Sequence, residues 1–307
     1  MPDLTGQVAV VTGATSGLGR QAAVELASRG AHVVVTGRDE RRGKAVVDAA
    51  RRVASAGELK WMPLDLAGVD GIIRFADTFH SQYGRLNTLV NNAGVMMVPE
   101  GRTIDGCERH FGVNHLGHFA LTAALLPTLL KTTAARIVTV TSASHHMGRI
   151  DMAADPTGAL TARTRPDAGP YRGFAAYALS KLANLVFAVE LQRRLDASGS
   201  RVRSLAAQPS LTRTAIADRA GWGSRLMIAL GRSPARGVTP VLYAATEPGV
   251  EGGSLFAPGG TAQIWGSPVA VRGAPAAYDP ALGDWLWQVS QSLTGVHPPL
   301  IDRQTEK

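Results

Sequence analysis

The chain has 307 residues, 45% of them apolar, which is enough to bury a full hydrophobic core. Its 34 glycines and 17 prolines are too few for a disordered chain, and a single cysteine, Cys107, excludes an intrachain disulfide and a metal site of several cysteines. The formal net charge of +8 suits an anionic partner, but the basic residues are scattered as singles and pairs. We therefore expect a solvated surface, no nucleic-acid role and no metal.

The location of the protein is predicted from three features. The amino end lacks a basic patch followed by an apolar run, which is the pattern of a signal peptide. The most apolar stretches, 119–130 and 182–189, are shorter than the roughly 20 residues that cross a bilayer. One cysteine fits a reducing compartment. The sequence thus predicts a cytoplasmic protein without membrane insertion.

Short apolar runs alternate with helical patterns along the chain. Predicted strands lie at 8–11, 32–36, 59–63, 88–90, 136–141 and 202–206, and segments such as 22–27, 111–130 and 177–195 have an apolar period of 3.6 residues. This alternation predicts an α/β fold with a doubly wound parallel sheet of the Rossmann type. We find no linker, so 1–307 is expected to form a single domain.

Two stretches interrupt the alternation. A polar insertion at about 148–173 contains three prolines, and long irregular loops of this kind are usually functional or disordered. The Gly/Pro-rich stretch at 248–275 is predicted to be irregular as well.

A glycine-rich turn at 12–19, with the sequence TGATSGLG, follows the first strand and opens a helix. Its glycines let backbone N–H groups approach a phosphate, and the helix N-terminus adds partial positive charge. Because the turn lies within a βαβ unit, it predicts dinucleotide binding.

The end of the second strand predicts which dinucleotide is bound. Gly37 stands where an NAD site has an acid for the ribose, and Arg38 follows it. An arginine side chain pairs well with a 2′-phosphate, so NADP (as NADPH) is predicted over NAD. Asp39 is the alternative, because a one-residue shift would make it the ribose-binding acid.

Candidate catalytic side chains lie on one helix and at one strand end. Tyr177 and Lys181 are four residues apart, which puts both on one helix face. An ammonium near a phenol lowers the pKa of that phenol, so Tyr177 is a candidate general acid/base. Ser142 closes the fifth predicted strand at the carboxyl edge of the sheet, where ligands bind in open α/β sheets.

Together these motifs resemble those of the short-chain dehydrogenase/reductase family. The turn matches TGxxxGxG, 91–94 matches NNAG, and 177–181 matches YxxxK, in order from about residue 6 to residue 260. Within the family, 114–119 and 180–184 are similar to retinol-dehydrogenase and protochlorophyllide-reductase-like members.

The resemblance implies roles for individual residues. Tyr177 would be the general acid/base, Lys181 its pKa depressor and a ribose contact, Ser142 the holder of the substrate oxygen, and Asn114 the support of a proton relay. The implied cofactor-binding set is Gly13, Ser16, Gly17, Leu18, Gly19, Arg38, Asp65, Leu66, Asn91, Ala93, Gly94, Tyr177, Lys181 and Thr214. The amide of Asn92 is interpreted as structural.

The chain departs from the family pattern at two places. Pro209-Ser210 stands where the family has Pro-Gly, which bears on the contact implied for Thr214. Ser144 also follows the fifth strand and is a rival for the role of Ser142.

Segment 211–235 is expected to be a substrate lid, by similarity to the family, and its apolar side chains suggest a lipophilic substrate. A core helix without ligand contact is the alternative for this segment. The expected function is NADP-dependent hydride transfer between nicotinamide and a lipophilic carbonyl or alcohol. Two alternatives stay open: a C=C reductase of the same fold, and a non-catalytic NADPH-sensing protein. The resemblance also implies a homo-oligomer, since family members are often dimers or tetramers.

Overall fold

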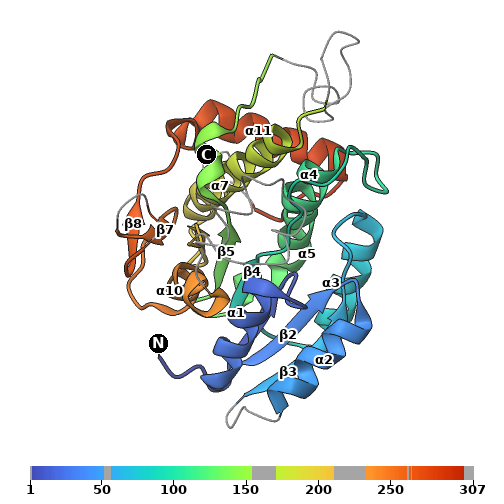
Figure 1. The fold of residues 1–307 in the computed structure, drawn as a ribbon, viewed down its shortest axis with the longest axis vertical. Helices are drawn as coiled ribbons and strands as arrows, with labels where there is room; N and C mark the ends of the chain where they lie inside the picture. The colour runs from blue at the N-terminus through green and yellow to red at the C-terminus, as the bar shows by residue number, and fades with distance from the viewer. Residues whose placement is uncertain are drawn as a thin grey trace.

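A computed structural model describes residues 2–51, 57–153, 171–210, 233–260, 263 and 265–300. Its strands form one eight-stranded sheet in the order β3-β2-β1-β4-β5-β6-β7-β8 (Figure 1). Neighbouring strands are parallel from β3 to β7, and only the β7–β8 pair is antiparallel. The predicted Rossmann-type sheet is confirmed, with the correction that one edge strand runs antiparallel.

The described strands agree closely with the predicted ones over the first two thirds of the chain. They are β1 (Val8–Val11), β2 (His32–Gly37), β3 (Glu58–Pro63), β4 (Thr88–Asn91), β5 (Arg136–Val140), β6 (Arg203–Ala207), β7 (Leu255–Pro258) and β8 (Pro268–Val271). The prediction that 248–275 is irregular was wrong, because β7 and β8 lie there. Each has four residues and a proline at one end, too short a run to display the period of a strand.

Helices cover both faces of the sheet (Figure 1). The longer ones are α1 (Gly17–Ser28), α2 (Glu40–Arg51), α3 (Val69–Gln82), α5 (Gly117–Lys131), α7 (Gly173–Ala197), α10 (Thr239–Thr246) and α11 (Pro280–Thr294). Short turns of helix are α4 (Arg109–Phe111), the π-turn η1 (Gly112–Leu116), the 3₁₀ turns η2 (Ala143–Met147) and η5 (Pro275–Tyr278), and α9 (Pro234–Gly237).

Alternate residues of β1 divide the core between the two faces. Ala9 and Val11 pack in a cluster with side chains of α1, α2 and α10, whereas Val10 packs in a second cluster with side chains of α3, α5 and α7. This is the two-residue period of a strand buried on both sides. The valine-rich runs of β1 and β2 follow from this burial.

Among the residues that the structure describes, two helical segments are long and apolar enough to cross a membrane, judged by length and composition alone. They are Arg109–Lys131 and Gly173–Ala197, and each extends beyond the apolar stretch visible in the sequence. Within the protein, 78% and 67% of their most apolar windows are buried. Most of each window is thus packed inside the protein, and the cytoplasmic location stays a prediction.

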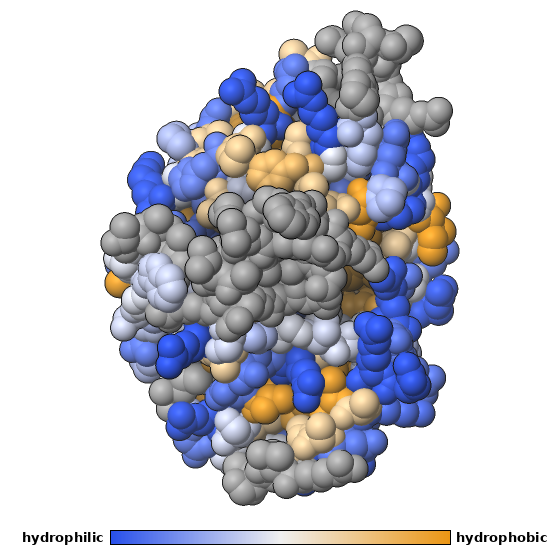
Figure 2. All heavy atoms as spheres, viewed as in Figure 1, coloured by the Kyte–Doolittle hydropathy of each residue, from blue (hydrophilic) through white to orange (hydrophobic). Residues whose placement is uncertain are grey.

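The visible surface is mixed in character. On the side shown in Figure 2, hydrophilic residues are widely spread, and apolar residues lie between them in small groups.

Candidate active site

The glycine turn is shaped by close contact with the loop after β4. Gly13 and Gly17 have φ of +64° and +55°, a region that favours glycine. A Cβ on Gly13 would lie 2.8 Å from the Cα of Ala93, and a Cβ on Gly19 would collide with the amide of Asn92. Only glycine lets the turn lie against this loop.

Thr12 fixes the loop against the turn. Its hydroxyl accepts hydrogen bonds from the backbone N–H groups of Asn92 and Ala93 at 2.8 and 2.9 Å, and the side-chain amide of Asn92 donates to the Thr12 carbonyl at 2.7 Å. These bonds agree with a structural role for Asn92. The turn and the loop thus form one braced unit.

The residues of the turn fit a dinucleotide phosphate. Helix α1 begins at Gly17, and among the described residues no side chain caps its N-terminus. The first turn of α1 contains no acidic residue. Free N–H groups at the start of a helix, next to glycines with no side chain in the way, are a binding site for an anion.

The two candidates for the ribose contact differ in their hydrogen bonds and ion pairs within the protein. Asp39 accepts the backbone N–H of Arg42 at 3.0 Å and lies 3.3 Å from the Arg42 guanidinium, so its carboxylate caps the start of α2. Arg38 is exposed just beyond β2 and has no hydrogen bond or ion pair with another residue of the described ranges. This arrangement favours Arg38 as the group free for a ligand.

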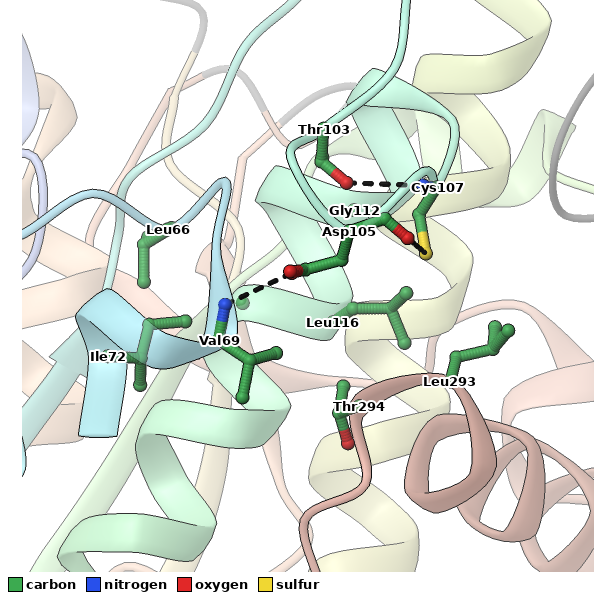
Figure 3. Close-up of a pocket in the computed structure, with 11 residues that line it drawn as sticks. Leu66, Val69, Ile72, Thr103, Asp105, Cys107, Gly112, Leu116, Leu293 and Thr294 are labelled. Atoms are coloured by element: carbon green, nitrogen blue, oxygen red, sulfur yellow. Dashed lines mark hydrogen bonds between the residues drawn. The ribbon is translucent and has the colours of Figure 1, made fainter.

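The residues predicted for the adenine side differ in their exposure to solvent. Asp65 is exposed and uses one carboxylate oxygen to accept the N–H of Ala67 at 3.0 Å. Leu66 is buried, and Figure 3 shows its side chain lining a small cavity of about 10 Å³ beside Cys107 and Leu116. That volume suits at most about one water molecule, so the cavity is not a substrate site.

Asn91 is also fully buried, and its amide donates to the hydroxyl of Thr122 at 2.9 Å. Both Asn91 and Leu66 therefore direct their side chains into the interior. A bound cofactor at these two positions would meet backbone atoms.

Asn114 lies on the π-turn η1, between α4 and α5. It is fully buried, accepts the N–H of Val95 at 2.8 Å, and donates to the Val95 carbonyl and the Ser180 hydroxyl at 3.0 Å each. A π-turn inserts one extra residue into the helical repeat and is frequent at functional sites. Here it places Asn114 between the loop after β4 and helix α7.

Sequence reasoning missed a histidine that links Asn114 to the glycine turn. Burial lowers the pKa of His118 to about 4, so its imidazole is neutral. Its Nδ1 donates to the Asn114 carbonyl at 2.8 Å, which leaves Nε2 to accept from the Thr12 hydroxyl at 2.8 Å. The signal was present as a histidine in the first turn of α5, a largely apolar helix.

Tyr177 and Lys181 lie on α7 with the spacing that the sequence predicted. The Nζ of Lys181 lies 5.8 Å from the centre of the Tyr177 ring. A Cβ on Gly94 would lie 3.2 Å from Oδ1 of Asn114 and 3.7 Å from Nζ of Lys181, so these two side chains flank the same glycine. The structure thus brings together Asn114 on η1 and the pair Tyr177 and Lys181 on α7, from two separate parts of the chain.

Ser142 follows β5 and begins η2. Its hydroxyl accepts the N–H of Ser144 at 3.3 Å, whereas the buried Ser144 hydroxyl has no partner within hydrogen-bond distance in the described part of the chain. Burial raises the pKa of Tyr177, and polar interactions with Ser142 and Ser144 act in the opposite direction. Both serines therefore lie at the phenol, and Ser144 stays a rival of Ser142.

Lys181 is buried at 4% exposure, and its Nζ donates to the Val140 carbonyl at 3.0 Å. Burial lowers the pKa of Lys181 to about 8. The expected lowering of the Tyr177 pKa by Lys181 stays a prediction, because burial is the dominant influence on the phenol.

Three predicted features lie wholly or mostly outside the described residues. Thr214 belongs to 211–232, which contains most of the lid expected at 211–235. Most of the insertion expected at 148–173 belongs to 154–170.

Comparisons with known proteins identify the family of this chain. A family model for short chain dehydrogenase matches residues 7–154. The chain is 44% identical over 261 residues to polyprenol dehydrogenase of Mus musculus, covering 82% of this chain and 75% of that protein. It is 37% identical over 300 residues to retinol dehydrogenase 12 of Homo sapiens, covering 95% and 88%.

Solved structures show the same architecture. A crystal structure of an uncharacterized protein from Mycobacterium Paratuberculosis has a TM-score of 0.80 and 38% identity, over 98% of this chain and 97% of that one. A short chain dehydrogenase from Shigella flexneri 2a str. 301, complexed with NADP, has a TM-score of 0.63 and 26% identity, over 83% and 98%. The fold and these relatives define the class of the protein as an oxidoreductase. The chain belongs to the short-chain dehydrogenase/reductase family.

Proposed function

We propose that this chain is an NADP-dependent oxidoreductase that acts on a lipophilic carbonyl or alcohol, with Tyr177 as general acid/base. The observation that carries the proposal is the convergence of Tyr177, Lys181 and Asn114 beside the carboxyl ends of β4 and β5. Ligands bind at this edge in open α/β sheets.

The cofactor would be held along the edge of the sheet from the glycine turn to α7. The uncapped start of α1 and the turn would bind the pyrophosphate, and Arg38 would pair with a 2′-phosphate. When bound, the nicotinamide supplies or accepts the hydride. The preference for NADP is supported by the role of Asp39 as a helix cap, and by NADP in a neighbouring structure.

Tyr177 would exchange the proton at the substrate oxygen. Because burial raises its pKa, the phenol carries its proton at neutral pH, which is the form that donates to a carbonyl oxygen during reduction. Ser142 would hold that oxygen, and the buried ammonium of Lys181 would favour the phenolate left after the transfer. Asn114 would support the return of the proton.

The surroundings of Tyr177 support a lipophilic substrate. Met97, Met147 and Phe174 are exposed apolar side chains, and Phe174 lies three residues before Tyr177 on α7. Gly173 lies beside Met97, and Gly148, the neighbour of Met147, lies against Ala178. The relatives named polyprenol dehydrogenase and retinol dehydrogenase point to the same class, a long apolar alcohol or its aldehyde.

Reduction of a C=C bond is the second candidate, because the same tyrosine can protonate carbon next to an activated alkene. A sensor without catalysis is less well supported, since Tyr177, Lys181, Ser142 and Asn114 are all present. The homo-oligomer stays a prediction.

The test is NADPH consumption with lipophilic aldehydes, ketones and enones, for the natural chain and Tyr177→Phe in parallel. Consumption that requires Tyr177 would support the oxidoreductase mechanism, and the responding compounds would separate carbonyl from alkene chemistry. NADPH binding without any turnover would favour the sensor.

A further inference from the structure

A buried polar network lies beside Tyr177 and has no part in the proposed chemistry. Glu108, the N-cap of α4, is 3% exposed, and His110 is fully buried. The Glu108 carboxylate accepts the Nδ1 proton of His110 at 2.9 Å and the hydroxyl proton of Tyr171 at 2.8 Å. It also accepts the backbone N–H groups of His110 and Phe111 at 2.9 and 2.7 Å.

This hydrogen bonding fixes the orientation of the His110 ring. Although burial opposes ionisation, the four donated hydrogen bonds lower the pKa of Glu108, so its oxygens only accept. Nδ1 of His110 therefore carries the proton, and the Tyr171 oxygen lies 2.8 Å from that nitrogen. Nε2, on the other side of the ring, is buried and has no hydrogen-bond partner among the described residues.

The network is connected to Tyr177 in two ways, through a ring contact and through the helix that carries Tyr177. The ring of His110 meets that of Tyr177 edge to face, with centroids 6.4 Å apart and planes inclined at 70°. Tyr171 lies two residues before α7, and Tyr177 lies on α7 about one turn after its first residue, Gly173. The Tyr171 hydroxyl thus ties the start of α7 to the start of α4, and Asn114 follows α4 on the π-turn.

This buried polar network lowers the stability of the folded state, so packing alone does not explain its presence. A buried carboxylate and a buried unpartnered ring nitrogen both destabilise the folded state relative to apolar residues of the same size. Phe at position 110 would fill the same space next to Tyr177 without the unpartnered nitrogen. The polar network instead holds the ring of His110 in a single orientation, and a fixed neighbouring ring is what a precise placement of Tyr177 requires.

We propose that Glu108, His110 and Tyr171 form a positioning network that holds the Tyr177 ring in register with Asn114 and Lys181. His110 and Tyr171 act through Tyr177 and are positioning residues. The inference rests on the proposed function of Tyr177, and the experiment separates the two.

The variants are Tyr171→Phe, which removes only the hydroxyl, and His110→Phe, which keeps a ring but removes the bonds at Nδ1. The chain offers a matched control at the opposite edge of the sheet, where the Tyr83 hydroxyl lies 2.8 Å from Nε2 of His32 and Glu58 lies 3.2 Å from Nδ1. Tyr83→Phe and His32→Phe break the same kinds of bond away from the site.

The first readout is independent of turnover. The chain contains five tyrosines, so NMR of ring-labelled tyrosine gives a small set of signals, and Tyr177→Phe identifies the one from Tyr177. Tyr171→Phe and His110→Phe should shift the Tyr177 signal, whereas Tyr83→Phe and His32→Phe should leave it in place. An unmoved signal in both site variants would overturn the inference.

The second readout is NADPH-dependent turnover. We expect kcat to fall about tenfold in each site variant, with KM for NADPH within about twofold and a larger solvent deuterium isotope effect, because proton transfer at Tyr177 becomes slower. The double variant should lose no more kcat than whichever single variant has the larger loss, since both residues act in one network.

The outcomes distinguish the two ideas. If Tyr177→Phe retains full turnover, the proposed function fails. If Tyr177→Phe is inactive while Tyr171→Phe and His110→Phe match the natural chain, only the positioning network is overturned. An equal loss in the Tyr83→Phe and His32→Phe controls would also overturn it, because the effect would then come from stability alone.

Discussion

The ammonium of Lys181 donates to the carbonyl oxygen of Val140 over 3.0 Å, and this is its one hydrogen bond with a residue of the described ranges. No carboxylate among those residues forms an ion pair with it. A cation kept in the interior on one neutral acceptor is costly, and its pKa of about 8 reflects that cost. In the proposed chemistry this charge would favour the phenolate of Tyr177.

Replacing Lys181 by Met should therefore stabilise the chain while abolishing turnover. Below pH 8 the folded and unfolded states both carry the proton, and only the folded state bears the burial cost. Between pH 8 and the ordinary pKa of 10.5 the folded state releases its proton first, so the natural chain gains stability as pH rises.

We expect the Lys181→Met gain to be about 1–3 kcal/mol at pH 7 and to shrink above pH 8. Urea unfolding at pH 7 and pH 10 measures it. Lys44→Met, at an exposed position, is the control and should show no comparable gain. A less stable Lys181→Met chain at pH 7 would contradict the burial argument.

Arg38→Ala should weaken NADPH binding by about 1–3 kcal/mol through loss of a charge-assisted pair with the 2′-phosphate. NADH affinity should barely change. Asp39→Ala is the control: it removes the cap of α2 and lowers stability, yet it should leave the ratio of NADPH to NADH affinity unchanged. Fluorescence titration with both cofactors measures the affinities, and equal losses in Arg38→Ala would exclude the assignment.

Gly13→Ala should destabilise the chain and remove dinucleotide binding. The residue combines a φ of +64° with a Cβ only 2.8 Å from the Cα of Ala93, so both the backbone and the contact resist a side chain. Gly6 provides the matched control, because its φ of +78° comes with no atom within 4 Å of a Cβ.

The cost of Gly6→Ala, about 1 kcal/mol, measures the backbone strain alone. We expect Gly13→Ala to cost clearly more in urea unfolding. Similar costs for the two variants would mean that the loop at Ala93 moves easily, and that the glycine turn and this loop do not form a rigid unit.

The pH dependence of the two reaction directions should be opposite. Because burial raises the pKa of Tyr177, its phenol is protonated at neutral pH, so reduction should proceed there and decline only in alkaline solution. Alcohol oxidation needs the phenolate, and its rate should rise with pH. Initial rates in each direction from pH 6 to about pH 10 measure this. A reduction rate that rises with pH would assign the proton donor to another group.

Much of the molecule was predictable because its constraints are local. The glycine turn follows a strand and opens a helix within eight residues, and Tyr177 and Lys181 share a helix face by spacing alone. Buried parallel strands are continuous valine-rich runs whose partners hardly affect their composition. β7 and β8 escaped prediction because strands of four residues are held by neighbours in the sheet rather than by their own pattern.

The tertiary structure decided what depends on contacts between distant segments. Sequence alone left Asp39 as a rival of Arg38, and only its bond to Arg42 shows that the carboxylate is already engaged. The π-turn that carries Asn114 and the link from Tyr171 to Glu108, 63 positions earlier, have no periodic signature. A local motif specifies which groups are available, whereas burial and the packing of remote elements determine which of them can still meet a ligand.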